Sequence, residues 1–240
     1  MRRMKNWLIG NMGIPGEYQY QSLHLVSTAV VLVVLAAVIC TGRSRRLDDR
    51  LKDRLLRAVC WFQLGFEVLW RLIYVTVKGD SILCWWPLYP CNLGGILIPI
   101  IALIGWKRGK DLFYLFGFIG GVLTFAIPEG IFVRDVLVFP VLKSILQHTG
   151  ILLIPALEVA AGKWRPSLHN LGWTILGCVI HLINCEGLTR LLGFTGDYMF
   201  FRSGLPFVIP GVPQFITLSV FSVLVLTAIS WISDLLGKKC

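Results

Sequence analysis

Seven long apolar runs, separated by short polar stretches, dominate the pattern of the chain. They lie at about 21–42, 58–77, 88–105, 112–128, 141–161, 168–192 and 213–236. An α-helix rises about 1.5 Å per residue, so a run of roughly 20 residues crosses a hydrocarbon core of about 30 Å. The pattern predicts an all-α, polytopic membrane protein with a bundle of seven transmembrane helices. Because the connections are too short for a soluble domain, residues 1–240 are expected to form a single integral membrane domain.

Composition excludes a soluble globular protein. Hydrophobic residues make up 56% of the chain and charged residues 15%, whereas soluble domains carry about 45–50% and about 25%. A globule of this length could not bury so much apolar surface.

Charge predicts which way the chain crosses the membrane. The net charge of +10 favours an anionic partner, but Lys and Arg lie in short connections rather than in a basic domain, so nucleic acid is not expected. One set of alternate connections holds fourteen Lys and Arg and the other holds six. Cytoplasmic loops are the basic ones, which predicts an outside N-terminus, a cytoplasmic C-terminus and multi-pass insertion in the plasma membrane of a bacterial cell.

The basic segment at 43–57 has a pattern of its own. Leu47, Leu51, Leu55 and Leu56 recur at helical spacing among charged residues. This spacing is typical of a short surface helix in the headgroup layer, which would bind anionic lipid. The alternative interpretation is an ordinary loop that sets topology.

Two patterns inside the spans have a structural interpretation. Glu67 and Arg71 are four residues apart on the second span, which places them on one helix face as a structural ion pair. Binding of a lipid headgroup is the alternative for this pair. Gly117 and Gly121 form a small-xxx-small pair, which predicts a close contact between helices.

The other polar residues at membrane depth gather near the outer ends of several spans. They come from the third, fifth and sixth spans and the loop after the sixth, and are Cys91, Asn92, Gln147, His148, His181, Asn184 and Tyr198. Intramembrane polar groups are costly and often functional. Their convergence predicts an outward-facing polar pocket.

A thiol and an imidazole in one pocket favour acyl transfer. The imidazole of His148 would take the proton of Cys91, and the thiolate would attack an ester. Each residue also has a structural interpretation: Cys91 could be a core thiol or form a disulfide with Cys84 or Cys185, and either His could tie helices together. No ligand spacing supports a metal site, and no cofactor is expected.

Three motifs resemble the YwaF-like family of bacterial integral membrane proteins. They are WPLYPCNLG at 86–94, the Gln147-His148 pair, and Asn184 followed by GDYMFF at 196–201. That family is similar to a eukaryotic seven-span acyltransferase that remodels ether phospholipids. The resemblance implies a seven-span bundle in which Cys91 matches the nucleophile and His148 the base, while Asn92, Asn184 and Tyr198 match cavity positions. The chain departs from the family pattern at Asp197, Ser203 and Gly204.

The sequence thus predicts a membrane-embedded lipid acyltransferase that moves an acyl chain between a phospholipid and a lysolipid or another amphiphile. Hydrolysis of the acyl intermediate is a close variant. Two other classes remain open: a transporter or channel for a small polar or amphiphilic solute, and a non-catalytic membrane subunit.

Overall fold

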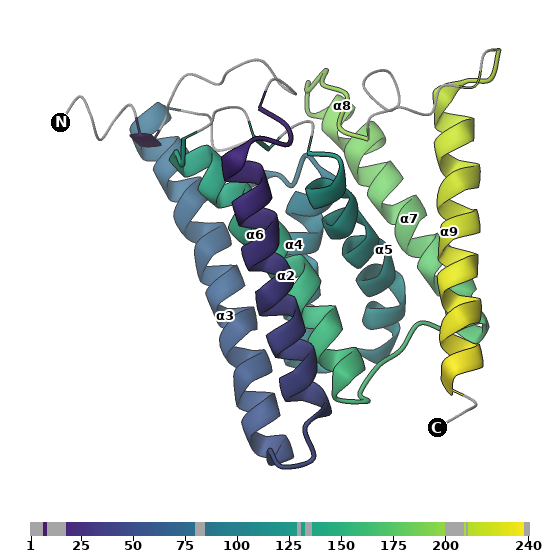
Figure 1. Cartoon of the computed structure of the whole chain (residues 1–240). Coiled ribbons are helices and arrows are strands. Elements are labelled where there is room, and N and C mark those ends of the chain that lie inside the picture. The colour runs from purple at the N-terminus through teal and green to yellow at the C-terminus, as the bar shows by residue number, and fades with distance from the viewer. Residues whose placement is uncertain are drawn as a thin grey trace.

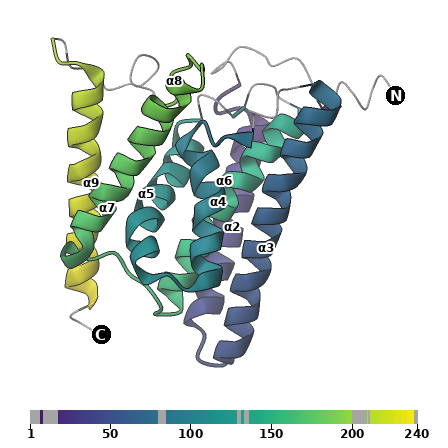
Figure 2. The ribbon, with the colours of Figure 1, turned by 180° about the vertical axis from the view of Figure 1, so that it is seen from behind.

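A computed structural model describes residues 7–8, 18–79, 85–128, 131–132, 136–199, 209 and 211–237. Within these ranges every regular element is helical and no strand occurs. The helices run alternately up and down as a bundle (Figures 1 and 2). They are α2 (Ser22–Arg43), α3 (Asp49–Ile73), α4 (Pro90–Ile104), α5 (Lys107–Ala126), α6 (Phe139–Ala160), α7 (Leu171–Leu182), α8 (Thr189–Leu191) and α9 (Gln214–Gly237).

Three shorter segments adjoin these helices. The π-helix η1 (Tyr74–Lys78) extends α3, the 3-10 turn η3 (Leu168–Asn170) leads into α7, and the π-helix η4 (Ile183–Leu188) joins α7 to α8. We call the end of the bundle where α2, α4, α6 and α9 begin the upper end, and the opposite end the lower end, as they stand in Figure 1.

The all-helical, multi-pass architecture is confirmed, but seven full spans are not. Six described helices are long and apolar enough to cross a membrane, whereas α4 has only 15 residues. Pro90 fixes the first turn of α4, and Gly105 ends it in the left-handed region at φ 67°. The expected third span, 88–105, is therefore a shorter apolar helix that packs among α3, α5 and α6.

The basic segment at 43–57 does not form a separate surface helix. The helix α3 begins at Asp49, directly after Asp48 accepts a hydrogen bond from the backbone N–H of Arg50 at 3.3 Å, and continues into the bundle. Leu56 is buried and Cys60 is fully buried in the main core. Of the four leucines, Leu56 lies on the buried face of α3, whereas Leu51 is 49% exposed and Leu47 lies in the turn before the helix. The predicted lipid contact of this segment stays a prediction.

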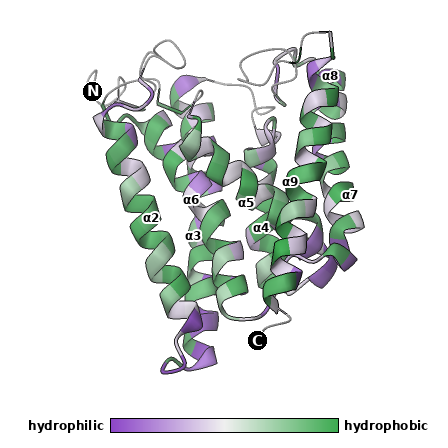
Figure 3. Ribbon diagram, turned by 45° about the vertical axis from the view of Figure 1, so that its right-hand side comes forward, coloured by the Kyte–Doolittle hydropathy of each residue, from purple (hydrophilic) through white to green (hydrophobic). Residues whose placement is uncertain are grey.

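The core lies between α3, α4, α5 and α6. Its fully buried side chains include Ile98, Ile101, Tyr114, Ile151 and Ile154. The helices α2 and α9 are mostly exposed, and hydrophobic residues predominate along the helices between the two ends of the bundle (Figure 3). This distribution suits a bundle surrounded by lipid.

Candidate functional site

The first turn of α4 presents a thiol at the upper end of the bundle. Pro90 and Cys91 open the helix, and the backbone N–H of Asn92 donates to the carbonyl of Tyr89 at 3.0 Å. Cys91 is a free, partly buried cysteine, and its Sγ lies 3.8 Å from Oδ1 of the buried Asn92. The alternative disulfide to Cys185 is not formed, since Cys185 is also free, whereas Cys84 lies outside the described residues.

Two residues of α6 reach this turn. Gln147 Nε2 donates to Asn92 Oδ1 at 3.1 Å and to the carbonyl of Cys91 at 3.4 Å. Lys143 Nζ donates to the same Asn92 oxygen at 3.4 Å. Lys143 and Gln147 are four residues apart, so both side chains leave the same face of α6. The turn that carries Cys91 is thereby tied to α6.

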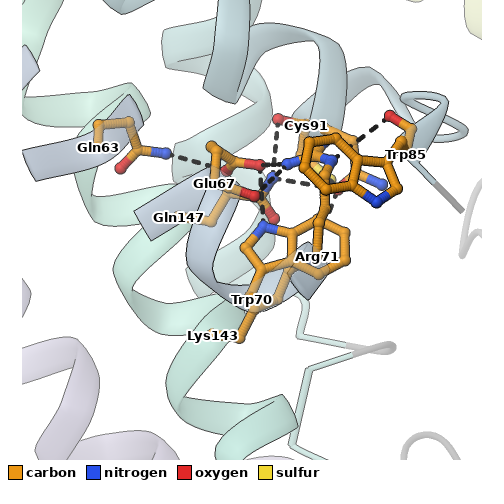
Figure 4. Close-up of polar contacts among 9 residues, drawn as sticks. Gln63, Glu67, Trp70, Arg71, Trp85, Cys91, Lys143 and Gln147 are labelled. Carbon is orange, nitrogen blue, oxygen red and sulfur yellow. Dashed lines mark hydrogen bonds and ion pairs between the residues drawn. The ribbon is translucent and has the colours of Figure 1, made fainter. Parts of the chain in front are cut away.

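The predicted ion pair on α3 lies beside Cys91 and Gln147 (Figure 4). Arg71 Nη1 contacts Glu67 Oε2, and both side chains are 3% exposed. Trp70 Nε1 donates to Glu67 Oε2 at 2.9 Å, and Gln63 Nε2 donates to Glu67 Oε1 at 3.2 Å. Arg71 Nε also donates to the carbonyl of Trp85 at 3.4 Å, next to the loop that leads into α4.

Close helix packing brings the carboxylate and the amide together. A Cβ at Gly95 of α4 would lie 2.6 Å from Glu67 Oε1 and 3.1 Å from Gln147 Nε2. Glycine leaves room for both groups at this point, and a larger residue would displace the end of the Glu67 side chain. These side chains thus form one largely buried group, which we call the thiol cluster. It consists of Gln63, Glu67, Trp70, Arg71, Cys91, Asn92, Lys143 and Gln147.

The thiol cluster carries more positive than negative charge. Arg71 and Lys143 are cations, and Glu67 is the carboxylate among them. Lys143 Nζ lies 4.4 Å from the centre of the Trp70 ring, a cation–π contact that stabilises the ammonium. Arg71 Nη2 and Gln147 Oε1 are buried and have no hydrogen-bond partner within the described structure. Arg71 Nη2 is an unused donor for an anionic group or a developing oxyanion, whereas Gln147 Oε1 is an unused acceptor.

His148 does not hydrogen-bond to the thiol in the described structure. Its Nδ1 lies 2.7 Å from the carbonyl of Ser144, and its ring stands edge-on to Phe125 at 6.5 Å between centroids. Gln147 rather than His148 contacts the backbone of Cys91. Adjacent residues diverge by about 100° around a helix, and this divergence sends the two side chains to different neighbours.

The residues predicted from the sixth span and the following loop lie around the cluster rather than within its hydrogen-bond network. Asn184, in the π-helix η4, donates to the carbonyl of Pro87 at 2.6 Å, and Tyr198 stacks edge-on against Tyr89 at 5.0 Å. Both therefore brace the segment that leads into Cys91. His181 is buried, with Nδ1 2.8 Å from the Gly177 carbonyl and its ring 4.7 Å from that of Phe116.

Sequence reasoning missed Lys143, Trp70 and Gln63. Lys143 is a cation in a predicted span, four residues before Gln147, and this spacing would have placed it in the pocket. Gln63 and Trp70 lie four residues before and three after Glu67, so the same rule applies to them. For metal binding, no group of three or more His, Cys, Asp or Glu side chains gathers among the described residues.

Comparison with known proteins places the chain in a family. No curated protein and no solved structure matches it. The family model described as the TMEM164 family matches residues 18–231, which include every residue of the thiol cluster. The chain therefore belongs to the TMEM164 family, a family of transmembrane proteins.

Proposed function

We propose that the protein is a lipid acyltransferase that uses Cys91 as its nucleophile. The observation that carries this proposal is a free thiol in the first turn of α4, beside a buried cluster with an excess of positive charge. A helix N-terminus stabilises a nearby anion, and thiolates attack esters readily.

The reaction has two balanced steps. In the first, Cys91 Sγ bonds to the acyl carbon of a phospholipid ester, its proton passes to a base, and the ester C–O bond breaks. The base returns the proton to the departing alkoxide, which leaves as a lysolipid. In the second, the hydroxyl of an acceptor lysolipid gives its proton to the base and bonds to the acyl carbon of the thioester. The C–S bond breaks, and the base returns the proton to the sulfur, which restores the thiol. Water in place of the acceptor gives hydrolysis.

His148 is the proposed base. A proton on Nδ1, donated to the Ser144 carbonyl, leaves the lone pair of Nε2 available to accept the thiol proton. Ile151 leaves the same face of α6 one turn deeper, and its Cδ1 would lie 3.8 Å from a Cβ placed on Gly94 of α4. That face also borders α5, since Ile151 Cγ2 would lie 3.4 Å from a Cβ on Gly117 and the His148 ring stands beside Phe125. Contact of His148 with Cys91, directly or through one water, is therefore part of the proposal.

In this proposal, the charged parts of the substrate are bound by Gln147, Lys143 and Arg71. The amide of Gln147 is directed at the first turn of α4, where the oxyanion would form. Lys143 and Arg71 supply positive charge for the phosphate of the headgroup. Asn92, Asn184 and Tyr198 hold the segment around the nucleophile in place.

An apolar groove beside the cluster suits an acyl chain. It lies between α3 and α6, has a volume of about 220 Å³, and is lined mainly by apolar side chains such as Val59, Phe62, Leu146 and Leu153. Gln63 lines the groove and also donates to Glu67. Gln63 therefore belongs both to the groove and to the thiol cluster.

The resemblance of the motifs around Cys91 and His148 to membrane acyltransferases of ether phospholipids agrees with this proposal. With the orientation predicted from charge, Cys91 would face the outer leaflet of the plasma membrane, and seven passes would place the ends of the chain on opposite sides.

A transfer assay with a trapped intermediate tests the proposal. The protein would be reconstituted with a phospholipid that carries a deuterated acyl chain and with an unlabelled lysophospholipid. We expect deuterated chains on the acceptor and a hydroxylamine-sensitive acyl adduct on Cys91 by mass spectrometry. Cys91→Ala should lose both, and His148→Gln should slow transfer about 100-fold or more.

Cys178→Ala is the matched control, because Cys178 is another free, partly buried cysteine, on α7. It should retain transfer and the adduct. Transfer at the unaltered rate by a folded Cys91→Ala variant would reject the covalent mechanism.

A further inference from the structure

A second charged site lies at the lower end of the bundle, away from Cys91. A pocket of about 470 Å³ opens between the start of α5 and the connection from α6 to α7. Its lining contains five basic residues, Lys107, Arg108, Lys110, Lys163 and Arg165, and one acidic residue, Asp111. We call it the basic pocket.

Two of its five cations are neutralised by carboxylates. Lys110 Nζ lies 2.5 Å from Glu158 Oε2 in a buried ion pair, and Lys163 pairs with Asp53 at the start of α3. The first pair joins α5 to α6, and the second joins the connection after α6 to α3, so these lysines have a structural use.

The lining carboxylate is held by neutral donors. Asp111 Oδ1 accepts hydrogen bonds from Trp164 Nε1 at 3.0 Å and from Asn170 Nδ2 at 3.2 Å. The charge of Asp111 is therefore used to fasten the connection between α6 and α7 to α5, rather than to pair with a lysine or arginine within the described structure.

Three cations remain without a carboxylate partner among the described residues: Lys107, Arg108 and Arg165. Arg108 lies 5.1 Å above the ring of Trp173, and Arg165 lies against the last residue of α9, where a Cβ on Gly237 would meet its Nη1. Both side chains are otherwise exposed, so their guanidinium groups are accessible to a ligand. Three unpaired positive charges around one pocket repel each other, and an anion would relieve that repulsion.

We propose that the basic pocket binds the phosphate group of an anionic phospholipid. Guanidinium groups match phosphate oxygens with paired hydrogen bonds, and Lys107 adds a third positive charge. Basic pockets between transmembrane helices are a recurrent type of site for anionic headgroups.

The surroundings favour a lipid over a soluble phosphate compound. The exposed rings of Trp106 and Trp173 flank the pocket region, and tryptophan concentrates at the membrane–water interface. Leu168 and Leu176 provide exposed apolar surface beside it along η3 and α7. A headgroup could occupy the pocket while its acyl chains lie against this surface.

Titration followed by native mass spectrometry tests the proposal. The full-length protein in mild detergent would be titrated with phosphatidylglycerol and with phosphatidylcholine of the same acyl chains. We expect a preference for phosphatidylglycerol of about tenfold or more, which the double variant Arg108→Gln/Arg165→Gln loses. The variant Lys107→Gln, which changes an exposed side chain, should reduce the preference several-fold with an unchanged unfolding midpoint.

Lys78→Gln/Arg190→Gln is the matched control, because it removes the same charge from exposed positions at the upper end, away from the basic pocket and from the basic segment at 43–57. The control should keep the preference. The proposal is overturned if folded Arg108→Gln/Arg165→Gln and Lys107→Gln variants keep it too, or if the control loses as much. Displacement of phosphatidylglycerol by an equal concentration of glycerol 3-phosphate would assign the site to soluble phosphates instead and overturn the lipid assignment.

Discussion

At the scale of single residues, one carboxylate organises the upper end of the bundle. Glu67 accepts hydrogen bonds from Gln63 and Trp70 and forms an ion pair with Arg71, all within two turns of α3. Removing that charge would leave the Arg71 guanidinium buried without its partner. The loss of one partner from a buried pair costs more than the pair itself contributes, since a charge is left uncompensated.

We therefore expect Glu67→Gln to lower the free energy of unfolding by about 3–5 kcal/mol, the range for a broken buried pair. Thermal unfolding in detergent, followed by intrinsic fluorescence, would measure the change.

Glu186→Gln provides the comparison. Glu186 and Arg190 also form an i,i+4 pair, but the arginine side chain is 36% exposed. Exposed pairs contribute about 0–1 kcal/mol, so this variant should unfold close to the unaltered protein. Equal destabilisation by both substitutions would contradict the role assigned to burial.

The sequence predicts which residues are polar at membrane depth better than it predicts their partners. The spacing of Glu67 and Arg71 alone predicts a pair, and the two side chains lie in contact. Gln147 and His148 are neighbours in the chain, yet only Gln147 hydrogen-bonds to the turn of Cys91. Which of two adjacent side chains faces a given helix depends on how α6 is rotated against α4, and rotation is set by packing between helices.

At the scale of whole helices, small residues set how closely the bundle packs. The predicted close contact at Gly117 and Gly121 is confirmed: a Cβ would lie 2.5 Å from Ile98 of α4 at the first and 2.8 Å from Leu152 of α6 at the second. Gly177 of α7 is tighter still, because a Cβ there would lie 1.8 Å from the backbone carbonyl of Leu112 on α5.

Gly177→Ala should therefore push α7 away from α5. A backbone carbonyl cannot move aside as a side chain can, so we expect a loss of about 1–3 kcal/mol of stability, the usual range for overpacking. The unfolding midpoint in detergent would report it.

Gly172→Ala lies on the same helix with nothing within 4 Å of the added Cβ and should change the midpoint little. If Gly177→Ala were as stable as Gly172→Ala, the close approach of α5 and α7 would be wrong.

Helix positions follow from hydropathy, but their local irregularities do not. His181 and Asn184 are three residues apart, a spacing that places side chains of a regular α-helix on one face, yet α7 changes to the π-helix η4 at Ile183. The wider turn alters the direction of the side chains that follow, so His181 packs against Phe116 while Asn184 reaches the Pro87 carbonyl. The apolar pattern of the sequence carries no mark of this change.

At the scale of the whole molecule, the two ends differ in the way their charges are used. The upper end buries the thiol cluster, whereas the lower end gathers the basic pocket and the charged turn between α2 and α3. With fourteen Lys and Arg in one set of connections against six in the other, the lower end is predicted to face the cytoplasm.

Labelling of intact cells with a membrane-impermeant maleimide tests that orientation. In a cysteine-free background, Thr195→Cys in the connection from α8 to α9 should react in intact cells. Ser44→Cys, between α2 and α3, should react only after the membrane is opened. The reverse pattern would invert the topology and place Cys91 on the cytoplasmic side.

The last helix has an unusual environment that follows from its few neighbours. The described contacts of α9 are chiefly with α7 and η3, and most of its side chains face outward. Lipid acyl chains, rather than protein, are therefore expected to surround most of α9. Its outward positions need only remain apolar and can exchange one aliphatic side chain for another, while the tertiary structure of the chain is concentrated in the helices that precede it.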